Sequence, residues 1–169
     1  MLFKKLSVFL FILLSATKLF AVEEIKNSGN QFNFFTGNFD FSDDKQSAYL
    51  VGFQHQNENL NRETFLGNVS PITGGFITEN SAAYIYTGVE WNVDMGSFFF
   101  TPSFAPGLYH EGDGKDLGHV LEFKSEVQLS YKTSDTTNFA FSYNHVSNAS
   151  LGDKNPGANS YMFNFLKNF

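Results

Sequence analysis

A histidine and a serine stand two residues apart at the end of an alternating segment. His145 and Ser147 follow a run in which Phe139, Phe141 and Tyr143 alternate with small polar residues. Because successive side chains of a strand point to opposite faces, His145 and Ser147 continue the row of the three aromatic residues. An imidazole beside a serine can accept the hydroxyl proton and later protonate a leaving group, which is the chemistry of ester hydrolysis.

A purely structural interpretation of this pair also stands. A histidine two residues from a serine arises often by chance, and polar side chains are ordinary where a membrane strand ends. An imidazole and a hydroxyl are nevertheless poor choices for burial against acyl chains, because each brings polar groups that need partners. The pair is therefore a candidate site for a substrate that presents an acyl ester at a membrane surface.

Eight segments have the length and the boundaries of membrane-spanning strands. A tilted strand crosses a bilayer in about 9–11 residues, and turn residues such as Ser42-Asp43-Asp44 and Asp94-Met95-Gly96 separate the segments. The segments are 31–41, 46–56, 62–77, 82–93, 97–109, 119–132, 137–147 and 159–169. The sequence therefore predicts an all-β fold, an eight-stranded antiparallel transmembrane β-barrel.

The connections between these segments differ in length. With both chain ends in the periplasm, the short connections near 94–96 and 133–136 fall on the periplasmic side. The more elaborate connections, 110–118 and 148–158, then face outside, as in outer-membrane barrels. This arrangement places the histidine and serine at the outer surface.

The sixth segment shows the clearest alternation. One face holds Leu121, Phe123, Ser125, Val127, Leu129 and Tyr131, and the other holds Glu122, Lys124, Glu126, Gln128 and Ser130. We predict that the first face contacts lipid and the second lines the lumen. Alternation alone also fits a soluble barrel with the apolar face inside. Side chains fill the interior of a barrel of eight strands, which argues against a porin.

The two ends of the chain carry features of export. Lys4 and Lys5 precede an apolar stretch at 6–16, too short to span a bilayer as a helix, which predicts a signal peptide over 1–21 and a barrel domain over 22–169. The last segment is an aromatic strand ending on Phe169, and resembles the signal read by the bacterial outer-membrane assembly machinery. We therefore expect that machinery as a partner and the outer membrane of a Gram-negative bacterium as the location.

Composition narrows the function classes. The chain has 18% aromatic residues and 22 Phe, yet its mean hydropathy is slightly negative and Asn, Ser and Gly are plentiful, a mixture that suits a barrel with lipid outside. The absence of cysteine excludes disulfides, thiol catalysis and a lipoprotein anchor. Removal of the leader leaves eight basic against 17 acidic residues, so nucleic acid is not an expected partner. The acidic loop 110–116 lacks the spacing of a calcium-binding loop, and we expect neither a metal nor a cofactor.

Several short motifs together resemble one family. His145-x-Ser147-Asn148-Ala149 followed by Asn155-Pro156-Gly157 looks like the signature of the lipid A 3-O-deacylases, outer-membrane enzymes. The segments 101–107 and 112–119, with Glu122-Phe123, are also similar to bacterial members of that family. The similarity is densest over 99–159 and thin before residue 60.

The resemblance implies a fold, a substrate and a set of roles. Its fold is an eight-stranded barrel, and its substrate is lipid A, from which the 3-position acyl chain is removed. Ser147 matches the nucleophile and His145 the base, while Asn148 and Asn155 match positions associated with stabilising the oxyanion. The family has a glutamate at the third catalytic position, where this chain has Asn159. By alternation Asn159 shares the lipid-facing row of Tyr161 and Phe163.

Asn159 leaves more than one outcome open. An amide oxygen can accept the imidazole N–H, but an uncharged group cannot stabilise imidazolium by charge. The chain is then an active enzyme adapted to asparagine, a slow enzyme, or an inactive barrel associated with lipopolysaccharide. An outer-membrane phospholipid acyl hydrolase is a further alternative, and the sequence leaves open whether the barrel is a monomer or a homodimer.

Overall fold

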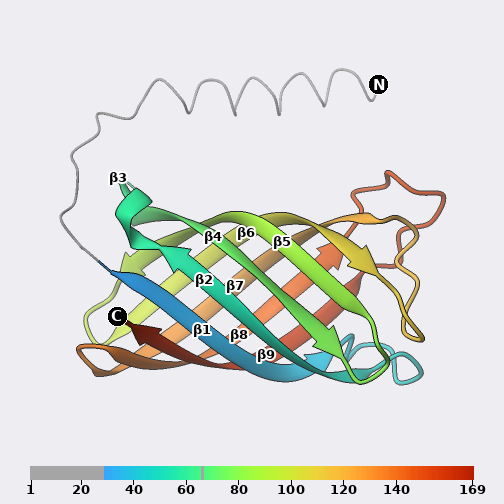
Figure 1. Cartoon of the computed structure of the whole chain (residues 1–169), viewed down its shortest axis with the longest axis horizontal. Coiled ribbons are helices and arrows are strands. Elements are labelled where there is room, and N and C mark those ends of the chain that lie inside the picture. Colours follow the sequence, from blue (N-terminus) through green and yellow to red (C-terminus); the bar gives the residue numbers. More distant parts are fainter. Residues whose placement is uncertain (1–28, 66) are drawn as a thin grey trace.

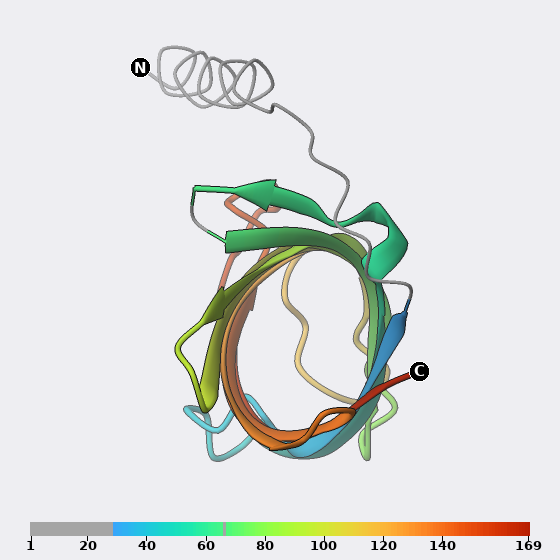
Figure 2. The same ribbon diagram turned by 90° about the vertical axis from the view of Figure 1, so that its left-hand side faces the viewer.

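The computed structural model describes residues 29–65 and 67–169, in which eight antiparallel strands close into a barrel. Figure 2 shows the closed ring from one end. The strands are β1 (Asn30–Phe39), β2 (Ala48–Asn57), β4 (Gly67–Thr78), β5 (Ala83–Asp94), β6 (Phe98–His110), β7 (Leu121–Ser134), β8 (Thr137–Ser147) and β9 (Ala158–Asn168). Each of these eight strands pairs with the next one along the chain, including β2 with β4. The pairing of β9 with β1 closes the barrel. The signal peptide predicted over 1–21 lies outside the described residues.

The prediction of one continuous strand over 62–77 is wrong. The segment contains a short strand β3 (Arg62–Thr64), which follows the 3-10 turn η1 (Glu58–Leu60), and then the wall strand β4. β3 folds back on the beginning of β4, and it lies outside the ring in Figure 2. Gly67 has a φ of +117°, a backbone conformation that favours glycine, so the chain can reverse its direction there.

The predicted faces of the strands are confirmed. On β7 the even-numbered residues from Glu122 to Ser130 are buried, while Val127, Leu129 and Tyr131 are exposed on the outside. An exposed apolar wall around a polar interior is the pattern of a membrane barrel and the reverse of a soluble one. Among residues 29–65 and 67–169, no helix has the length and apolar character needed to cross a membrane.

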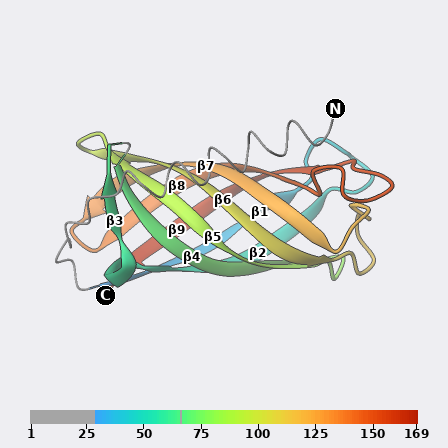
Figure 3. The same ribbon diagram turned by 90° about the horizontal axis from the view of Figure 1, so that it is seen from above.

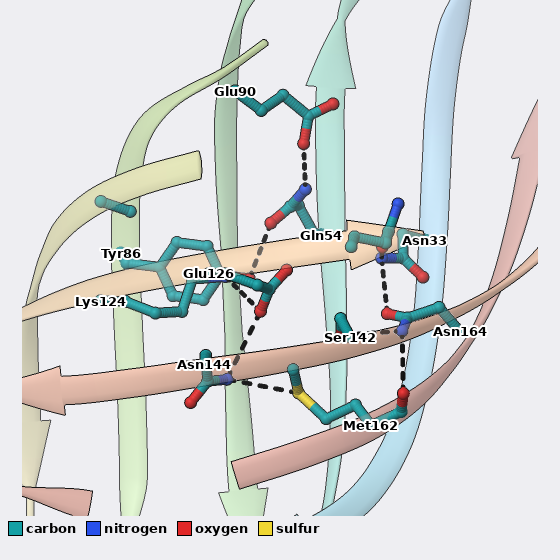
Figure 4. Close-up of polar contacts among 12 residues, drawn as sticks. Asn33, Gln54, Tyr86, Glu90, Lys124, Glu126, Ser142, Asn144, Met162 and Asn164 are labelled. Carbon is teal, nitrogen blue, oxygen red and sulfur yellow. Dashed lines mark hydrogen bonds and ion pairs between the residues drawn. The ribbon is translucent and has the colours of Figure 1, made fainter. Parts of the chain in front are cut away.

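Polar side chains fill the middle of the barrel and bind one another (Figure 4). Gln54 donates to Glu90 at 3.0 Å and accepts from the Tyr86 hydroxyl at 3.0 Å. Lys124 and Glu126 form a buried ion pair at 3.2 Å. Because Glu90, Lys124 and Glu126 are each paired or hydrogen-bonded, the interior tolerates these three groups without a water-filled channel.

The connections gather in two groups, one at each end of the barrel. The loops 40–47, 79–82, 111–120 and 148–157 lie together at the end opposite the C-terminus, which we call the loop end (Figures 1 and 3). Aromatic rings fill the interior just below it, with Phe76 5.6 Å from both Phe39 and Tyr84 and Phe39 6.2 Å from Tyr109, centroid to centroid. This apolar layer supports the loop end from inside.

Candidate active site

β8 carries the predicted histidine and serine to the rim of the loop end. Its side chains alternate between buried and exposed, and His145 is exposed in the same outward row as Tyr143. Ser147 is the last residue of the strand and is partly exposed, while Val146 between them is fully buried inside. The strand therefore presents the imidazole and the hydroxyl side by side on the membrane-facing surface.

Asn159 lies directly opposite His145 on the neighbouring strand. The two residues are register partners in the β8–β9 pairing, and His145 Nδ1 is 2.9 Å from Asn159 Oδ1. Because an amide oxygen only accepts hydrogen bonds, the imidazole must donate from Nδ1–H. The neutral ring then carries its lone pair on Nε2, which is the tautomer that a general base needs.

Two further side chains hold the Asn159 amide. The Tyr143 hydroxyl donates to Asn159 Oδ1 at 2.7 Å, and Asn159 Nδ2 donates to Ser42 Oγ at 3.1 Å. Tyr143 comes from the same outward row as His145, whereas Ser42 comes from the loop 40–47, far away in the sequence. The amide is thus bound on both its oxygen and its nitrogen.

Gly157 gives the imidazole the space that it occupies. A Cβ on this residue would lie 2.7 Å from His145 Cε1 and 3.1 Å from Nε2, closer than a side chain allows. Its φ of +64° is also in the left-handed region that favours glycine. The glycine of the Asn-Pro-Gly motif therefore keeps the base side of the ring clear.

Ser147 stands next to the imidazole without being bound to it. Within the described part of the chain, no hydrogen bond joins Ser147 Oγ to His145. Hydrogen bonds between catalytic groups are often long in substrate-free sites and shorten when substrate binds. The arrangement therefore provides an oriented base with a neighbouring hydroxyl.

Asn148 and Asn155 meet at the base of the loop that follows Ser147. Asn148 is fully buried, and its Nδ2 donates to the carbonyl oxygens of Leu117 and Lys154, both at 2.8 Å. Its backbone N–H donates to Asn155 Oδ1 at 3.1 Å. The Asn148 side chain therefore ties the loops 111–120 and 148–157 together. The Asn155 side chain is in turn held by the backbone N–H of Asn148, directly after Ser147.

An ion pair between Lys154 and Asp116 adds to this connection at the surface. The hydrogen bond from Lys154 Nζ, followed by one from the backbone N–H of Gly118, lowers the pKa of Asp116. Asp116 therefore stays ionised at neutral pH and keeps its pairing with Lys154.

The described residues contain no cluster of three or more His, Asp or Glu side chains that could hold a metal ion.

Aromatic rings surround the site on the membrane-facing wall. Phe41 lies 5.4 Å from Tyr161 and 6.2 Å from Tyr143, and Phe141 lies 6.2 Å from Tyr161, between ring centroids. These rings form an apolar surface next to His145 on the outside of the barrel. The polar site consequently borders a surface suited to hydrocarbon.

Sequence reasoning missed the partners that hold Asn159. In the sequence Ser42 stands in a run of turn residues and Tyr143 in an apolar row, and neither pattern indicates a contact with Asn159. No local pattern connects Ser42 to Asn159, because 117 residues separate them and barrel closure alone brings them together. The alternation did predict that Asn159 shares the outward face with His145.

Comparisons with known proteins agree with this geometry. A family model described as lipid A 3-O-deacylase (PagL) matches residues 34–168. The chain is similar to the crystal structure of the outer membrane enzyme PagL, with a TM-score of 0.62 and 16% identity over 81% of this chain and 98% of that chain. It also resembles a de novo designed transmembrane β-barrel, with a TM-score of 0.50 and 11% identity over 87% of this chain and 100% of the design. No curated protein matches the chain in sequence.

The structural similarities, at these identities, show the fold. The family match runs from β1 to β9 and includes His145, Ser147 and Asn159. It agrees with the outward apolar wall and places the protein in the outer membrane of Gram-negative bacteria. The chain belongs to the lipid A 3-O-deacylase (PagL) family.

Proposed function

We propose that this protein is an outer-membrane esterase that hydrolyses the 3-position acyl ester of lipid A, with Ser147 as nucleophile and His145 as base. One observation supports the proposal most strongly. His145 Nδ1 is bound to Asn159 Oδ1 at 2.9 Å, so the ring proton lies on Nδ1 and Nε2 keeps its lone pair on the membrane-facing rim beside Ser147. Membership of the lipid A 3-O-deacylase family supports lipid A as the substrate.

The reaction follows from the positions of the two side chains. His145 Nε2 accepts the proton from Ser147 Oγ as the oxygen attacks the ester carbonyl carbon. Collapse of the tetrahedral intermediate breaks the bond to the sugar 3-oxygen, which takes the proton from the imidazolium. His145 then deprotonates a water molecule that attacks the acyl-serine, and the products are a free fatty acid and the restored hydroxyl.

Asn148 and Asn155 are the proposed surroundings of the oxyanion. Donors at this place stabilise the negative charge that develops on the carbonyl oxygen. The Asn148 side chain is already bound to two backbone carbonyls, and the backbone N–H of Asn148 donates to Asn155 Oδ1. The Asn155 Nδ2 group is therefore the donor we expect to meet the oxyanion, with Asn148 holding Asn155 and the loop in place.

Asn159 determines how fast the proposed reaction runs. The amide holds the correct imidazole tautomer, but it lacks the charge that would stabilise imidazolium in the transition state. The existing contact of 2.9 Å shows that a side chain of asparagine length already reaches the ring. Asn159→Asp is therefore the carboxylate substitution that fits the site, since glutamate would add a methylene group.

The test is the mass of lipid A from a Gram-negative host with and without the protein. We expect the loss of one 3-hydroxyacyl chain from the 3-position, and no loss when the host expresses Ser147→Ala. Phospholipids from the same cells are analysed in parallel. Unchanged lipid A with increased lysophospholipid would favour the phospholipid hydrolase, and no change in either lipid would contradict catalysis.

A further inference from the structure

An asparagine in a catalytic relay has an orientation, which a carboxylate lacks. The Asn159 amide presents an oxygen that accepts and an NH₂ group that donates. If the amide turned by 180°, NH₂ would face His145 Nδ1, and the imidazole would have to accept there and carry its proton on Nε2. The ring would then be unable to act as a base toward Ser147, so something must set the orientation.

The Tyr143 hydroxyl does not set it. A hydroxyl both donates and accepts, so Tyr143 can bind either end of the Asn159 amide. In the structure it donates to Oδ1 at 2.7 Å, but it could equally accept from NH₂ after a turn. The determinant must be a partner whose own hydrogen-bonding role is fixed.

Ser42 is such a partner because of Asp40. The Ser42 hydroxyl donates to Asp40 Oδ1 at 3.1 Å, and an ionised carboxylate can only accept. With its proton committed to Asp40, Ser42 Oγ can act only as an acceptor toward Asn159, and it lies 3.1 Å from Nδ2. A turned amide would place two acceptors together and break this chain of donors.

Asp40 is itself held firmly. It is fully buried, forms an ion pair with Lys115 from the loop 111–120, and accepts the backbone N–H of Asn159 at 3.3 Å. The next residue, Phe41, donates its N–H to the Asn159 carbonyl at 3.0 Å. Because Lys115 balances its charge, Asp40 acts mainly through the direction of its hydrogen bonds.

We propose that Asp40 and Ser42 are positioning residues that orient the Asn159 amide, and through it select the base tautomer of His145. Asp40 fixes the Ser42 proton, Ser42 fixes the amide nitrogen, and the amide oxygen fixes the proton on His145 Nδ1. The inference deepens the proposed esterase function and rests on it. Through these two residues of the loop 40–47, a neutral side chain at the third catalytic position can hold the imidazole in one tautomer.

The direct test is the tautomer of His145, measured by ¹⁵N NMR of the refolded, histidine-labelled barrel in micelles. At about pH 8 an ordinary imidazole is neutral, and its protonated and unprotonated nitrogens have different shifts. The chain has four histidines, and His145→Ala identifies the relevant signals. We expect Nδ1–H in the wild type, a shift toward Nε2–H in Ser42→Ala, and Nδ1–H again in Ser42→Thr.

Ser47→Ala is the matched control. Ser47 lies in the same loop and donates to Asn38 Oδ1 at 2.7 Å, and among the described residues no hydrogen bond joins it to Asn159. Its removal should leave the tautomer unchanged. An unchanged tautomer in Ser42→Ala, or an equal shift in Ser47→Ala, would overturn the proposal. This readout requires no turnover, so it remains decisive even if lipid A proves not to be the substrate.

Turnover supplies a second measurement through a double-mutant cycle with Asn159→Asp. Ser42→Ala should lower kcat by about tenfold in the wild type, the size of one oriented hydrogen bond. In the Asn159→Asp background the same change should have less than about a twofold effect, because either carboxylate oxygen can accept from the imidazole. Equal losses in the two backgrounds would mean that Ser42 merely stabilises the loop, and would contradict the proposal.

Discussion

The two ends of the barrel use polar side chains in different ways. At the loop end, Asn148 is fully buried and donates to the backbone carbonyls of Leu117 and Lys154, so one amide fixes two loops. At the opposite end, mainly Asn and Gln side chains line a cavity of about 270 Å³ and bind one another, as Gln31 binds Asn168 at 2.9 Å. Amides at the loop end thus hold particular backbone segments, while those at the opposite end line the lumen and bind other side chains.

This difference predicts where substitutions affect function. Substitutions around His145 should alter activity with little effect on folding, because these side chains lie on the outer wall and do not fill the barrel interior. Comparable substitutions at the opposite end should lower stability slightly and leave activity unchanged. The predictions below take matched residues from the two regions.

The largest effect is expected from the reacting pair. Ser147→Ala and His145→Ala should each lower turnover by about 10³-fold or more, as removal of a triad member does in serine hydrolases. Both side chains face outward, so the folded barrel should keep its heat-modifiable migration on gels. Deacylation is measured as fatty acid released from lipid A by the purified protein in detergent.

Ser125 provides the control for Ser147. It is exposed on the outer face of β7 and is the register partner of His145 in the β7–β8 pairing. Ser125→Ala should retain full activity. Loss of activity in this variant, with activity retained in Ser147→Ala, would transfer the nucleophile to β7.

A smaller loss is expected from Gly157→Ala. The new Cβ would lie 2.7 Å from His145 Cε1 and must displace the imidazole. A misplacement of about 1 Å can lower a rate by about 10²-fold, so we expect a loss of that order in turnover. Gly96→Ala is the matched variant, because Gly96 also has a positive φ, of +83°, but nothing lies within 4 Å of its added Cβ. It should stay fully active, and equal losses in the two variants would indicate backbone strain alone.

A pair of amides, one from each end, sharpens the comparison further. Asn148→Ala removes the side chain that ties loops 111–120 and 148–157, and we expect about a tenfold loss of activity from the loosened loop. Gln31→Ala removes a single hydrogen bond to Asn168 at the opposite end. It should lower the free energy of unfolding by about 1 kcal/mol, measured in urea with micelles, and leave activity unchanged. A larger activity loss in Gln31→Ala than in Asn148→Ala would reverse the distinction between the two ends.

The sequence predicted those features that depend on local alternation. Side-chain parity assigned His145, Ser147 and Asn159 to the outer face, and the strand boundaries agree closely with β1, β2 and β5 to β9. It failed at 62–77, where the chain reverses at Gly67 and β3 leaves the wall, because a glycine does not by itself mark a turn: Gly74 and Gly75 lie inside β4.

The contacts that complete the site could not be predicted in the same way. Asp40 and Ser42 reach Asn159 only because β1 pairs with β9 and the loop 40–47 lies against the beginning of β9. Likewise, the tie from Asn148 to Leu117 joins loops 31 residues apart. Such contacts depend on barrel closure, and the spacing of residues along the chain does not predict them.

The central claim is that His145 activates Ser147 at the membrane-facing rim, and covalent trapping tests it most directly. A lipophilic sulfonyl fluoride reacts with serines that a neighbouring base activates, and the modified residue is found by mass spectrometry of the digested protein. We predict an adduct on Ser147 in the wild type, a normal yield in Ser125→Ala, and strongly reduced labelling in His145→Ala. An adduct on another residue, or undiminished labelling of Ser147 without His145, would contradict the account.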